Sequence, residues 1–528
     1  MDIRTVDILL VSALNLYAAM THTIHSSDLP APRTNVTVRL RPDVPATLAA
    51  LVHARDALDG GKRPDADTFL VLSLLLLKVA SDATYYGNPD IPYSPGEPPR
   101  CVPYSVPLQA RFDTLFRQRH AEGNGLRVMN ALRVFTLANP RKLGGLFPTL
   151  KLEDALPDDP VVRDAVLLQV LERLALPALD FRQQRGVPRP DVGDAVDALL
   201  PAQVPAGVSW LMAALTHPCA DEAVYDPSCR QGAVLRAAAS WMRDAESAIG
   251  PAGPARYPLY GQEPDAMQCA VARLRLLLQG TDTPRLFVRD PLEEPLLQDG
   301  ELQRFHVALA CPPLSLKWAP AQASHDPYFR FLQGVPSRQW AHTALIQHML
   351  ATLEPVRGRM AIVVPHGVLF RDGEEARIRQ CWLDANLVDM VIGLPDRLFA
   401  GASVATALLV LRKVRRHDAV LFVDARGLAT RGKRGPRLGD QAARTLHRLC
   451  SERRTVPGVA YLASSEELAR NGGNLSVARY VQPVARCPAA DLATLRAQRA
   501  ELSARFVALQ AALNAELDAL ERELSDLT

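Results

Sequence analysis

Four short polar motifs, each directly after an apolar run, constrain this chain more than any other feature. The apolar runs predict short strands at Ala223–Tyr225, Pro258–Tyr260, Leu286–Val288 and Val307–Ala310. The motifs that follow them are Asp226-Pro227-Ser228-Cys229-Arg230-Gln231-Gly232, Gly261-Gln262-Glu263, Arg289-Asp290-Pro291-Leu292 and Cys311-Pro312-Pro313-Leu314. A Gly-containing turn followed by acidic strand ends is how a doubly wound α/β sheet forms a nucleotide site at its carboxyl edge. The run from Tyr225 to Trp318 therefore predicts an α/β fold with the remains of an S-adenosylmethionine (SAM) pocket and an amino-group site beside it.

Strands and helices continue to alternate as far as residue 416. Further strands are predicted at Arg359–Val364, Leu387–Ile392 and Val404–Leu411, and Ala419–Val423 could add an eighth. Helices are predicted at Ala233–Ile249, Asp265–Gln279 and Trp340–Leu353. About seven strands with interleaved helices favour a Rossmann-like parallel or mixed sheet covered on both faces. We assign residues 201–485 to this domain.

The first 200 residues are mainly helical in pattern. Helices are predicted at Ile8–Met20, Asp65–Ser81, Leu108–His120, Gly125–Leu137 and Asp159–Leu176, and the alternation Val36, Val38, Leu40 could be a strand. The segment has no acid–base or metal cluster of its own. Residues 1–200 are therefore predicted to form a recognition or docking domain.

The last part of the chain, residues 486–528, has leucines at spacings of three and four with dense charges between them. This pattern predicts a coiled-coil-type helix that cannot bury its apolar stripe alone. The helix could fold back on its own domain or pair with a partner's helix.

Composition narrows the class of protein. The net charge of +3 means that any nucleic-acid surface must be local, and the 8 Cys have no CxxC spacing, so neither a zinc site nor a disulfide framework is predicted. The most apolar run, Phe69–Leu77, is well short of the ~18 apolar residues that a membrane span needs. We expect a soluble, cytoplasmic protein with no membrane segment.

A locally basic segment follows the predicted strand Val404–Leu411. The candidate nucleic-acid residues in it are Arg412, Lys413, Arg415, Arg416, Arg431, Lys433 and Arg434. Such residues are usually solvated surface, and contact with phosphates is favoured only by the neighbouring predicted site. Both interpretations stay open.

Methylation of an exocyclic amine requires particular residue types, and the four motifs carry some of them. Gly residues let backbone approach the methyl donor, and Asp226 and Glu263 can take its ammonium group and ribose hydroxyls, with Asp290 at the purine edge. An Asn carboxamide and a Pro carbonyl usually accept the amine hydrogens, while an aromatic ring stacks on the flipped base.

With further motifs added, the chain resembles the methylation subunit of type I restriction–modification systems, an N6-adenine DNA methyltransferase family. The likeness extends from about residue 65 to the tail. The additional motifs are Phe69–Asp82, Asp191–Ala195, Pro365–Arg371, Ile392–Pro395, Leu398-Phe399, Asn474-Leu475 and Arg479-Tyr480.

That resemblance implies a cofactor and partners. It implies SAM as the cofactor and an adenine flipped out of double-stranded DNA as the target. It also implies an assembly of two methylation subunits around one DNA-specificity subunit whose helices meet the carboxyl-terminal tails, with a paralogous methylation subunit or a nuclease/translocase subunit as further partners. The residues carried over to the cofactor site are Pro205, Asp226, Pro227, Arg230, Gln231, Gly232, Glu263 and Asp290, and those carried over to the catalytic position are Cys311, Pro312, Pro313 and Leu314.

The chain departs from the family at several of these positions. Arg230 and Gln231 stand where the family's DPxCGSG motif has Gly and Ser, and Cys311 and Leu314 stand where NPPF has Asn and Phe. A thiol is a weak acceptor, and Leu cannot stack as a ring does. Upstream, Pro205 is what remains of a Tyr-Thr-Pro element.

The lost contacts together could cost more than ~4 kcal/mol, about a thousandfold in rate. We therefore predict a subunit with impaired or no catalysis that acts in DNA binding and assembly. The alternatives are an active N6-adenine DNA methyltransferase and a pure interaction protein.

Overall fold

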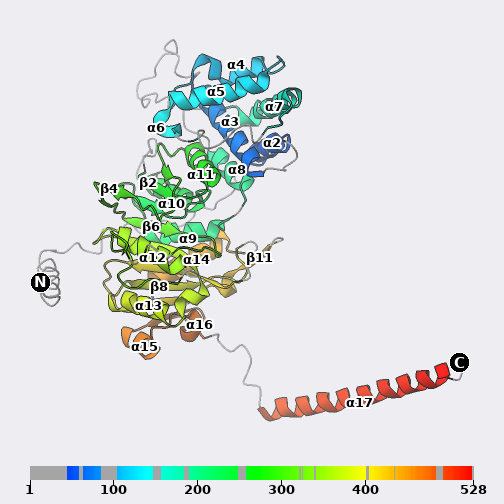
Figure 1. Ribbon diagram of the computed structural model, residues 1–528. Helices are drawn as coiled ribbons and strands as arrows, with labels where there is room; N and C mark the ends of the chain where they lie inside the picture. Colours follow the sequence, from blue (N-terminus) through cyan, green and yellow to red (C-terminus); the bar gives the residue numbers. More distant parts are fainter. Residues whose placement is uncertain are drawn as a thin grey trace, which may run out of the picture. The chain divides into compact units, whose positions relative to one another are not determined.

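The computed structural model describes residues 44–525, except 59–63, 85–103, 145, 147–155, 183–189, 202, 248–256, 320–322, 324, 338–340, 400–403, 433–434 and 483–491 (Figure 1). The chain divides into two compact units, residues 1–40 and 41–528, and every described element belongs to the second. The predicted helix Ile8–Met20 and the alternating stretch 36–40 lie outside the described residues. The three-domain division of the sequence stays a prediction.

The amino-terminal part of the second unit is helical, as predicted. Its helices are α2 (Val44–Asp56), α3 (Pro64–Thr84), α4 (Phe112–Arg117), α5 (Asn124–Ala138), α6 (Pro140–Leu143), α7 (Pro160–Leu174) and α8 (Pro190–Leu199). The predicted run 108–120 is divided, because Arg111 has extended backbone angles between the short 3-10 turn Leu108–Ala110 and α4. Helix α3 is buried on all sides over Thr68–Ala83, which explains why its sequence is apolar all round.

A buried ion pair lies on α3 in this helical region. Lys78 Nζ is 2.7 Å from Asp82 Oδ2 one turn along α3, and both side chains are nearly inaccessible. The same carboxylate oxygen accepts a hydrogen bond from the Phe181 backbone amide, and Lys78 lies over the Phe112 ring. The pair therefore joins α3 to two other segments.

Substituting Lys78 with Ala is expected to lower the free energy of unfolding by about 3–5 kcal/mol, because the Asp82 carboxylate would be left buried without its cation. Arg377→Ala is a matched control, since Arg377 pairs with Glu374 on an exposed surface and should cost below about 1 kcal/mol. Urea unfolding of both variants measures the difference. Equal losses would show that the buried pair has no special role.

The α/β region is built on a mixed nine-stranded sheet of order β13-β10-β8-β9-β7-β6-β1-β2-β3. Its strands are β1 (Val224–Asp226), β2 (Leu259–Gln262), β3 (Arg285–Phe287), β6 (Val307–Ala310), β7 (Arg359–Pro365), β8 (Val388–Gly393), β9 (Thr406–Arg412), β10 (Val420–Asp424) and β13 (Ala460–Ala463). The α/β prediction is confirmed, and eight of these strands lie where the sequence predicted them, within about two residues. Strand β13 was missed.

Helices cover both faces of this sheet. They are α9 (Ala206–Thr216), α10 (Ala233–Ser247), α11 (Ala266–Leu278), α12 (Ala341–Thr352), α13 (Glu374–Asp384), α14 (Asp440–Glu452), α15 (Ser465–Arg470) and α16 (Val477–Tyr480). Two short hairpins, β4 (Leu297–Gln298) with β5 (Glu301–Leu302) and β11 (Thr430–Gly432) with β12 (Gly435–Arg437), lie outside the sheet. Along β7, Ala361 and Val363 enter one apolar core while Met360, Ile362 and Val364 enter the other. Burial on both sides explains the continuous apolar strands.

Strand direction decides which residues share an edge. Strands β1, β2, β3, β6, β7, β8 and β10 are parallel, whereas β9 and β13 run the other way. The carboxyl ends of the parallel strands therefore meet at one edge, which holds the four sequence motifs. The carboxyl end of β9 lies at the opposite edge, where Arg412 pairs in register with Arg359 at the start of β7.

The tail residues Leu492–Ser525 form one helix, α17, as the heptad-like spacing predicted. No described helix is both long and apolar enough to cross a membrane.

Candidate functional site

The loop between β1 and α10 forms the centre of the candidate site. Asp226 ends β1, and its Oδ1 accepts a hydrogen bond from the Ser228 amide at 2.9 Å. The loop then turns through two left-handed residues, Arg230 (φ 46°) and Gly232 (φ 74°). Gly adopts this conformation freely, whereas any residue with a Cβ is strained there. Arg230 therefore stands at a backbone position that favours Gly.

Glu263 fixes the shape of this loop. One carboxylate oxygen accepts from the Arg230 amide at 3.0 Å, and the other accepts from the Asp265 amide at 3.1 Å. Burial raises the pKa of Glu263 above its usual value. The carboxylate predicted to bind ribose is thus hydrogen-bonded to the chain's own backbone.

Asp226 is the most strongly perturbed carboxyl group at this edge. It is 1% exposed, and its Oδ2 has no hydrogen-bond partner among the described residues. Burial raises its pKa to about 8, the hydrogen bond from Ser228 lowers it, nearby Glu263 raises it further, and Arg230 opposes the rise. A buried carboxyl group with an unused oxygen suits a cationic or hydrogen-bond-donating ligand.

Asp226→Asn is expected to remove a pH dependence of stability. The folded pKa lies above the unfolded value, so the folded state holds the extra proton and the wild-type free energy of unfolding falls as pH rises from about 4 to about 8. Asn cannot ionise, so the variant should gain on the wild type across this window, by about 5 kcal/mol at pH 8, at about 1.4 kcal/mol for each unit of the pKa shift. Urea unfolding at pH 5, 7 and 8 measures this, with exposed Asp372→Asn as control. A variant less stable than the wild type at pH 8 would contradict it.

The rest of the loop is packed against its neighbours. Gln231 is buried with its Oε1 unpartnered among the described atoms, and its backbone carbonyl accepts from Arg275 Nη1 at 3.0 Å. A Cβ on Gly232 would come within 3.1 Å of the Ala272 Cβ. Pro227 is buried, and Pro205 precedes the first turn of α9. That these residues bind a cofactor stays a prediction.

The second group of predicted residues follows β6. Cys311 is 3% exposed, and burial together with Asp226 raises the pKa of its thiol to about 12, while Arg230 opposes this. The thiol is thus protonated and close to the acidic end of β1. Pro312 is buried, whereas Pro313 and Leu314 are partly exposed.

His342, which the sequence analysis did not single out, lies beside this motif at the start of α12. Its side chain is buried, its Nε2 has no partner among the described residues, and the Pro313 carbonyl is close to the ring. Burial lowers its pKa to about 4, so the imidazole is neutral at pH 7. A single His in an apolar helix gives no signal in the sequence.

Asp290 lies apart from the other acidic residues. Its Oδ1 accepts from the Leu292 amide at 2.8 Å, and it lines a hollow of about 1230 Å³. Trp318, Tyr328 and Phe331 line the same hollow, whereas Asp226, Glu263 and Cys311 do not. Aromatic rings beside a carboxylate are suited to a planar purine.

A buried polar network that the sequence did not predict begins at Tyr225 in β1. The Tyr225 hydroxyl donates to Gln262 Oε1 at 2.7 Å and lies 2.9 Å from His348 Nε2. On its other side the His348 ring meets Arg330, which also pairs with Asp326. This network ties β1 to β2, α12 and the wall of the hollow.

The motifs downstream of the sheet strands also pack together. Leu475 donates its backbone amide to the Leu369 carbonyl at 2.8 Å, and Tyr480 donates its hydroxyl to the Asn474 carbonyl at 2.6 Å. The Tyr480 ring stacks on Phe422 with centroids 3.9 Å apart. The framework around the candidate site is therefore well formed.

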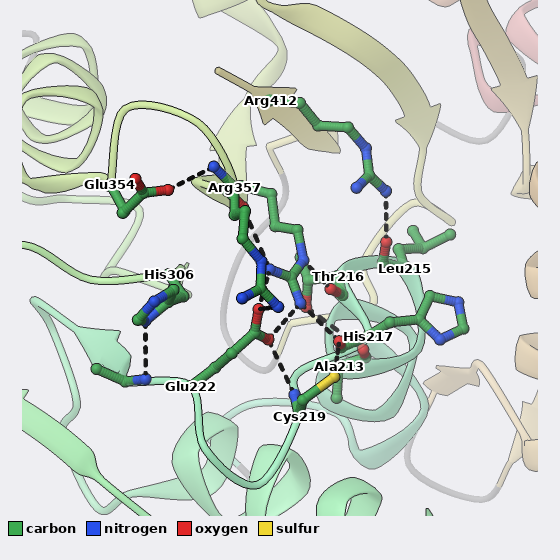
Figure 2. Close-up of polar contacts among 12 residues, drawn as sticks. Ala213, Leu215, Thr216, His217, Cys219, Glu222, His306, Glu354, Arg357 and Arg412 are labelled. Atoms are coloured by element: carbon green, nitrogen blue, oxygen red, sulfur yellow. Dashed lines mark hydrogen bonds and ion pairs between the residues drawn. The ribbon is translucent and has the colours of Figure 1, made fainter. Parts of the chain in front are cut away.

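The basic residues directly after β9, residues 412–416, lie at the opposite edge of the sheet, not beside the candidate site. Figure 2 shows Arg412 donating a hydrogen bond to the Leu215 carbonyl. In the same region the buried Glu222 forms ion pairs with Arg357 and Arg359. Arg412 also pairs with Asp389.

The other basic residues differ in their surroundings. Arg415 pairs with Asp389 and donates to Asn386 Oδ1, and Lys413 is partly buried, whereas Arg416 is exposed. Arg431 belongs to β11, and Lys433 and Arg434 lie outside the described residues. Phosphate contact was expected here because the segment was thought to lie beside the site, and residues 412–416 do not. Nucleic-acid binding by the segment stays a prediction.

Comparison with known proteins adds to this geometry. Residues 203–486 match the family described as N-6 DNA Methylase. The MpnII methylase subunit of a type I restriction enzyme from Mycoplasma pneumoniae is 27% identical over 304 residues, 55% of this chain and 54% of the relative. The MjaVII methylase subunit from Methanocaldococcus jannaschii is 28% identical over 279 residues, 50% of this chain and 46% of the relative. The chain thus spans about half the length of the curated relatives it matches.

Solved structures share the fold. The methyltransferase subunit of a type I restriction-modification system from Streptococcus thermophilus matches with a TM-score of 0.70 at 23% identity, covering 84% of this chain and 100% of that chain. A chain from a study of complex assembly and conformational transition in the type I R-M system matches with a TM-score of 0.60 at 17% identity, covering 90% and 99%.

Proposed function

The chain belongs to the N-6 DNA methylase family, and we propose that it is a type I restriction–modification or related phage-defence subunit whose methyl transfer is impaired. In this proposal the subunit binds double-stranded DNA and takes part in assembly of the complex. One observation is the main support for impaired methyl transfer. The donor loop, which should approach a cofactor through bare backbone, instead holds Arg230 in a left-handed conformation.

The cofactor implied by the family is SAM, and the residues here fit it only in part. The unpartnered Oδ2 of Asp226 suits the cationic end of such a molecule. The Arg230 guanidinium lowers the pKa values of Asp226, Glu263 and Cys311, so it lies in the same electrostatic neighbourhood. A fixed cation there disfavours a sulfonium ligand, and we derive no chemical step through SAM.

The amine site supports the same conclusion. The protonated Cys311 thiol is a weak hydrogen-bond acceptor where an amide oxygen would take an amine hydrogen. Leu314 offers no ring for stacking. The neutral His342 beside Pro313 has a ring nitrogen without a partner among the described residues.

The alternative, an active N6-adenine DNA methyltransferase, draws on the residues that are retained. Asp226, Gly232, Glu263, Asp290 and Pro312 all remain at the carboxyl edge. Activity would then require that Arg230 swings clear of the cofactor or pairs with its carboxylate.

The proposed partners follow from the family. The curated relatives are named as methylase subunits of type I restriction enzymes, which supports assembly with a DNA-specificity subunit and, beyond it, a nuclease/translocase subunit. We also propose a cytoplasmic location, where such a complex would meet double-stranded DNA.

Two measurements on the full chain, alone and with its specificity subunit, test the proposal. We expect duplex DNA to bind the complex with an affinity that falls steeply with salt, and tritiated methyl from SAM to enter DNA at least a hundredfold more slowly than with an active family member. Ordinary methylation would overturn the impairment. No salt-dependent DNA binding would instead support a pure interaction protein.

A further inference from the structure

A hollow of about 320 Å³ lies at the edge of the sheet opposite the candidate site. It forms where the carboxyl-terminal ends of α9, β9 and α14 meet the start of β8. We call it the basic hollow, because the charged residues that line it are Asp389, Arg412, Arg415, Arg416 and Arg453. A volume of this size is enough for a small ligand.

The basic hollow has more positive than negative charge. Four arginines line it, and Asp389 is the single carboxylate among its lining residues, so the surplus is three positive charges. The carboxyl-terminal ends of α9 and α14 offset about one of these, because each helix end has about half a negative charge. A surplus of about two positive charges remains.

Three of the four arginines are held in place around Asp389. Arg412 Nε and Arg453 Nη1 each donate to its carboxylate at 2.7 Å, and Arg415 Nε lies 3.4 Å from it without a hydrogen bond. Arg412 is held a second time, by the Leu215 carbonyl (Figure 2). Guanidinium groups fixed in this way are pre-organised donors for an anion with several acceptor oxygens.

The arginines lie at different depths. The Arg415 side chain is 3% exposed and that of Arg453 19%, whereas Arg416 is exposed and has no polar contact with the described residues. A second hollow of about 570 Å³ shares these three arginines, and its one carboxylate, that of Asp418, is exposed. A ligand can therefore place one end in the basic hollow and the rest of the molecule in the second hollow.

The charge surplus selects the class of ligand. A terminal phosphate has about two negative charges at pH 7 and three acceptor oxygens, which match the surplus and the arginine donors. Each phosphodiester of duplex DNA has one charge and is flanked by sugars on both sides, so it reaches Arg416 more readily than the buried Arg415. His217 Nε2 and His447 Nε2 lie 3.4 Å apart beside the hollow, but the arginines disfavour a metal cation between them.

We infer that the basic hollow binds the terminal phosphate of a small phosphorylated molecule. The inference goes beyond the proposed function, because the hollow lies away from the candidate methyl-transfer site and its ligand is neither SAM nor DNA. The competing interpretation is an ion-pair cluster that only stabilises the fold.

Isothermal titration calorimetry of the full chain with inorganic phosphate and with pyrophosphate, at constant ionic strength, tests the inference. We expect one site per chain, with a dissociation constant below about 1 mM for phosphate and about tenfold lower for pyrophosphate, which has more charge. No binding of either anion at about 10 mM would overturn the inference.

Two substitutions locate the site. Arg416→Gln and Arg453→Gln should each weaken pyrophosphate binding about tenfold, because each removes a charged donor. Arg416 has no structural contact to lose, so its variant remains informative if Arg453→Gln fails to fold. Arg448→Gln is the matched control, since Arg448 is exposed on α14 and does not line the hollow. Equal affinities in Arg416→Gln and the control would show that the anion binds elsewhere.

Asp389→Asn separates a ligand site from a purely structural cluster. The variant leaves three arginines without their carboxylate, so it should unfold at a lower temperature than the wild type. Pyrophosphate should then raise the Tm of the variant more than that of the wild type, because the anion replaces the lost charge. An equal or smaller rise in the variant would favour the structural cluster.

Competition with DNA completes the test. A duplex of about 20 base pairs without terminal phosphates should not displace pyrophosphate from the full chain. Displacement that is lost in Arg416→Gln would assign these arginines to the DNA backbone and overturn the inference.

Discussion

Restoring Gly at Arg230 and Ser at Gln231 is expected to raise the affinity for SAM at least tenfold. The guanidinium lies in the electrostatic neighbourhood of Asp226 and Glu263, where it competes with the cationic groups of the ligand. Two unit charges about 8 Å apart repel each other by about 2 kcal/mol at an effective dielectric constant of 20, which is about thirtyfold in affinity. Isothermal titration calorimetry of both proteins measures the change.

S-Adenosylhomocysteine separates charge from shape in this experiment. It lacks the sulfonium charge, so the double variant should improve its binding much less than that of SAM. If both ligands gain equally, steric crowding by the Arg230 side chain is the cause.

Arg397→Gly is the matched control, because Arg397 is also an arginine with a left-handed backbone (φ 56°), although it is exposed and Arg230 is partly buried. Each Arg→Gly change should relieve backbone strain of about 1 kcal/mol, but only the change at Arg230 should alter SAM affinity. Wild-type binding in the low micromolar range would contradict the premise that Arg230 blocks the pocket.

The strands could be predicted where a motif marked their ends. Parallel strands buried on both faces are continuous apolar runs, and the motifs of the first four fixed where each one stops. Strand β13 was missed because it is a four-residue edge strand with two partly exposed residues and no motif after it. The division of the run 108–120 depends on one extended residue, Arg111, which periodicity cannot reveal.

Strand direction was the main fact that the sequence could not supply. Apolar periodicity is the same for a parallel and an antiparallel strand, so nothing indicated that β9 is reversed. That reversal takes Arg412 to the edge opposite Asp226, where it holds Asp389 and the end of α9. His342 was hidden for a related reason, since only the fold brings the start of α12 beside Pro313.

The sequence could predict those residues of the candidate site that come directly after a strand. Asp226, Glu263 and Cys311 share one electrostatic environment, as their positions after β1, β2 and β6 suggested. The sequence could not predict that Glu263 is engaged by backbone amides, because that contact depends on how the loop through Arg230 turns. One departure from the family motif and the left-handed backbone thus concern the same residue, Arg230.

Methyl transfer should return only when both halves of the site are restored. Cys311→Asn with Leu314→Phe replaces the amine acceptor and the stacking ring, which together are worth about 4 kcal/mol, but it leaves the donor loop unchanged. The loop variant, Arg230→Gly with Gln231→Ser, restores the donor loop but leaves the amine site unchanged. We therefore expect each pair alone to gain less than about tenfold in rate, and the quadruple variant at least a hundredfold, because the residues act as a unit.

Tritiated methyl incorporation into duplex DNA, with the specificity subunit present, measures these rates. Adding Asp290→Ala to the quadruple variant is the control, since loss of the purine-edge carboxylate should remove the gain without disturbing the loop. If Cys311→Asn with Leu314→Phe alone restores ordinary rates, the donor loop is competent as it stands and the lesion lies in the amine site. If the quadruple variant binds SAM tightly yet transfers nothing, the impairment extends beyond these four positions, and His342, which lies against the Pro313 carbonyl, is the next residue to test.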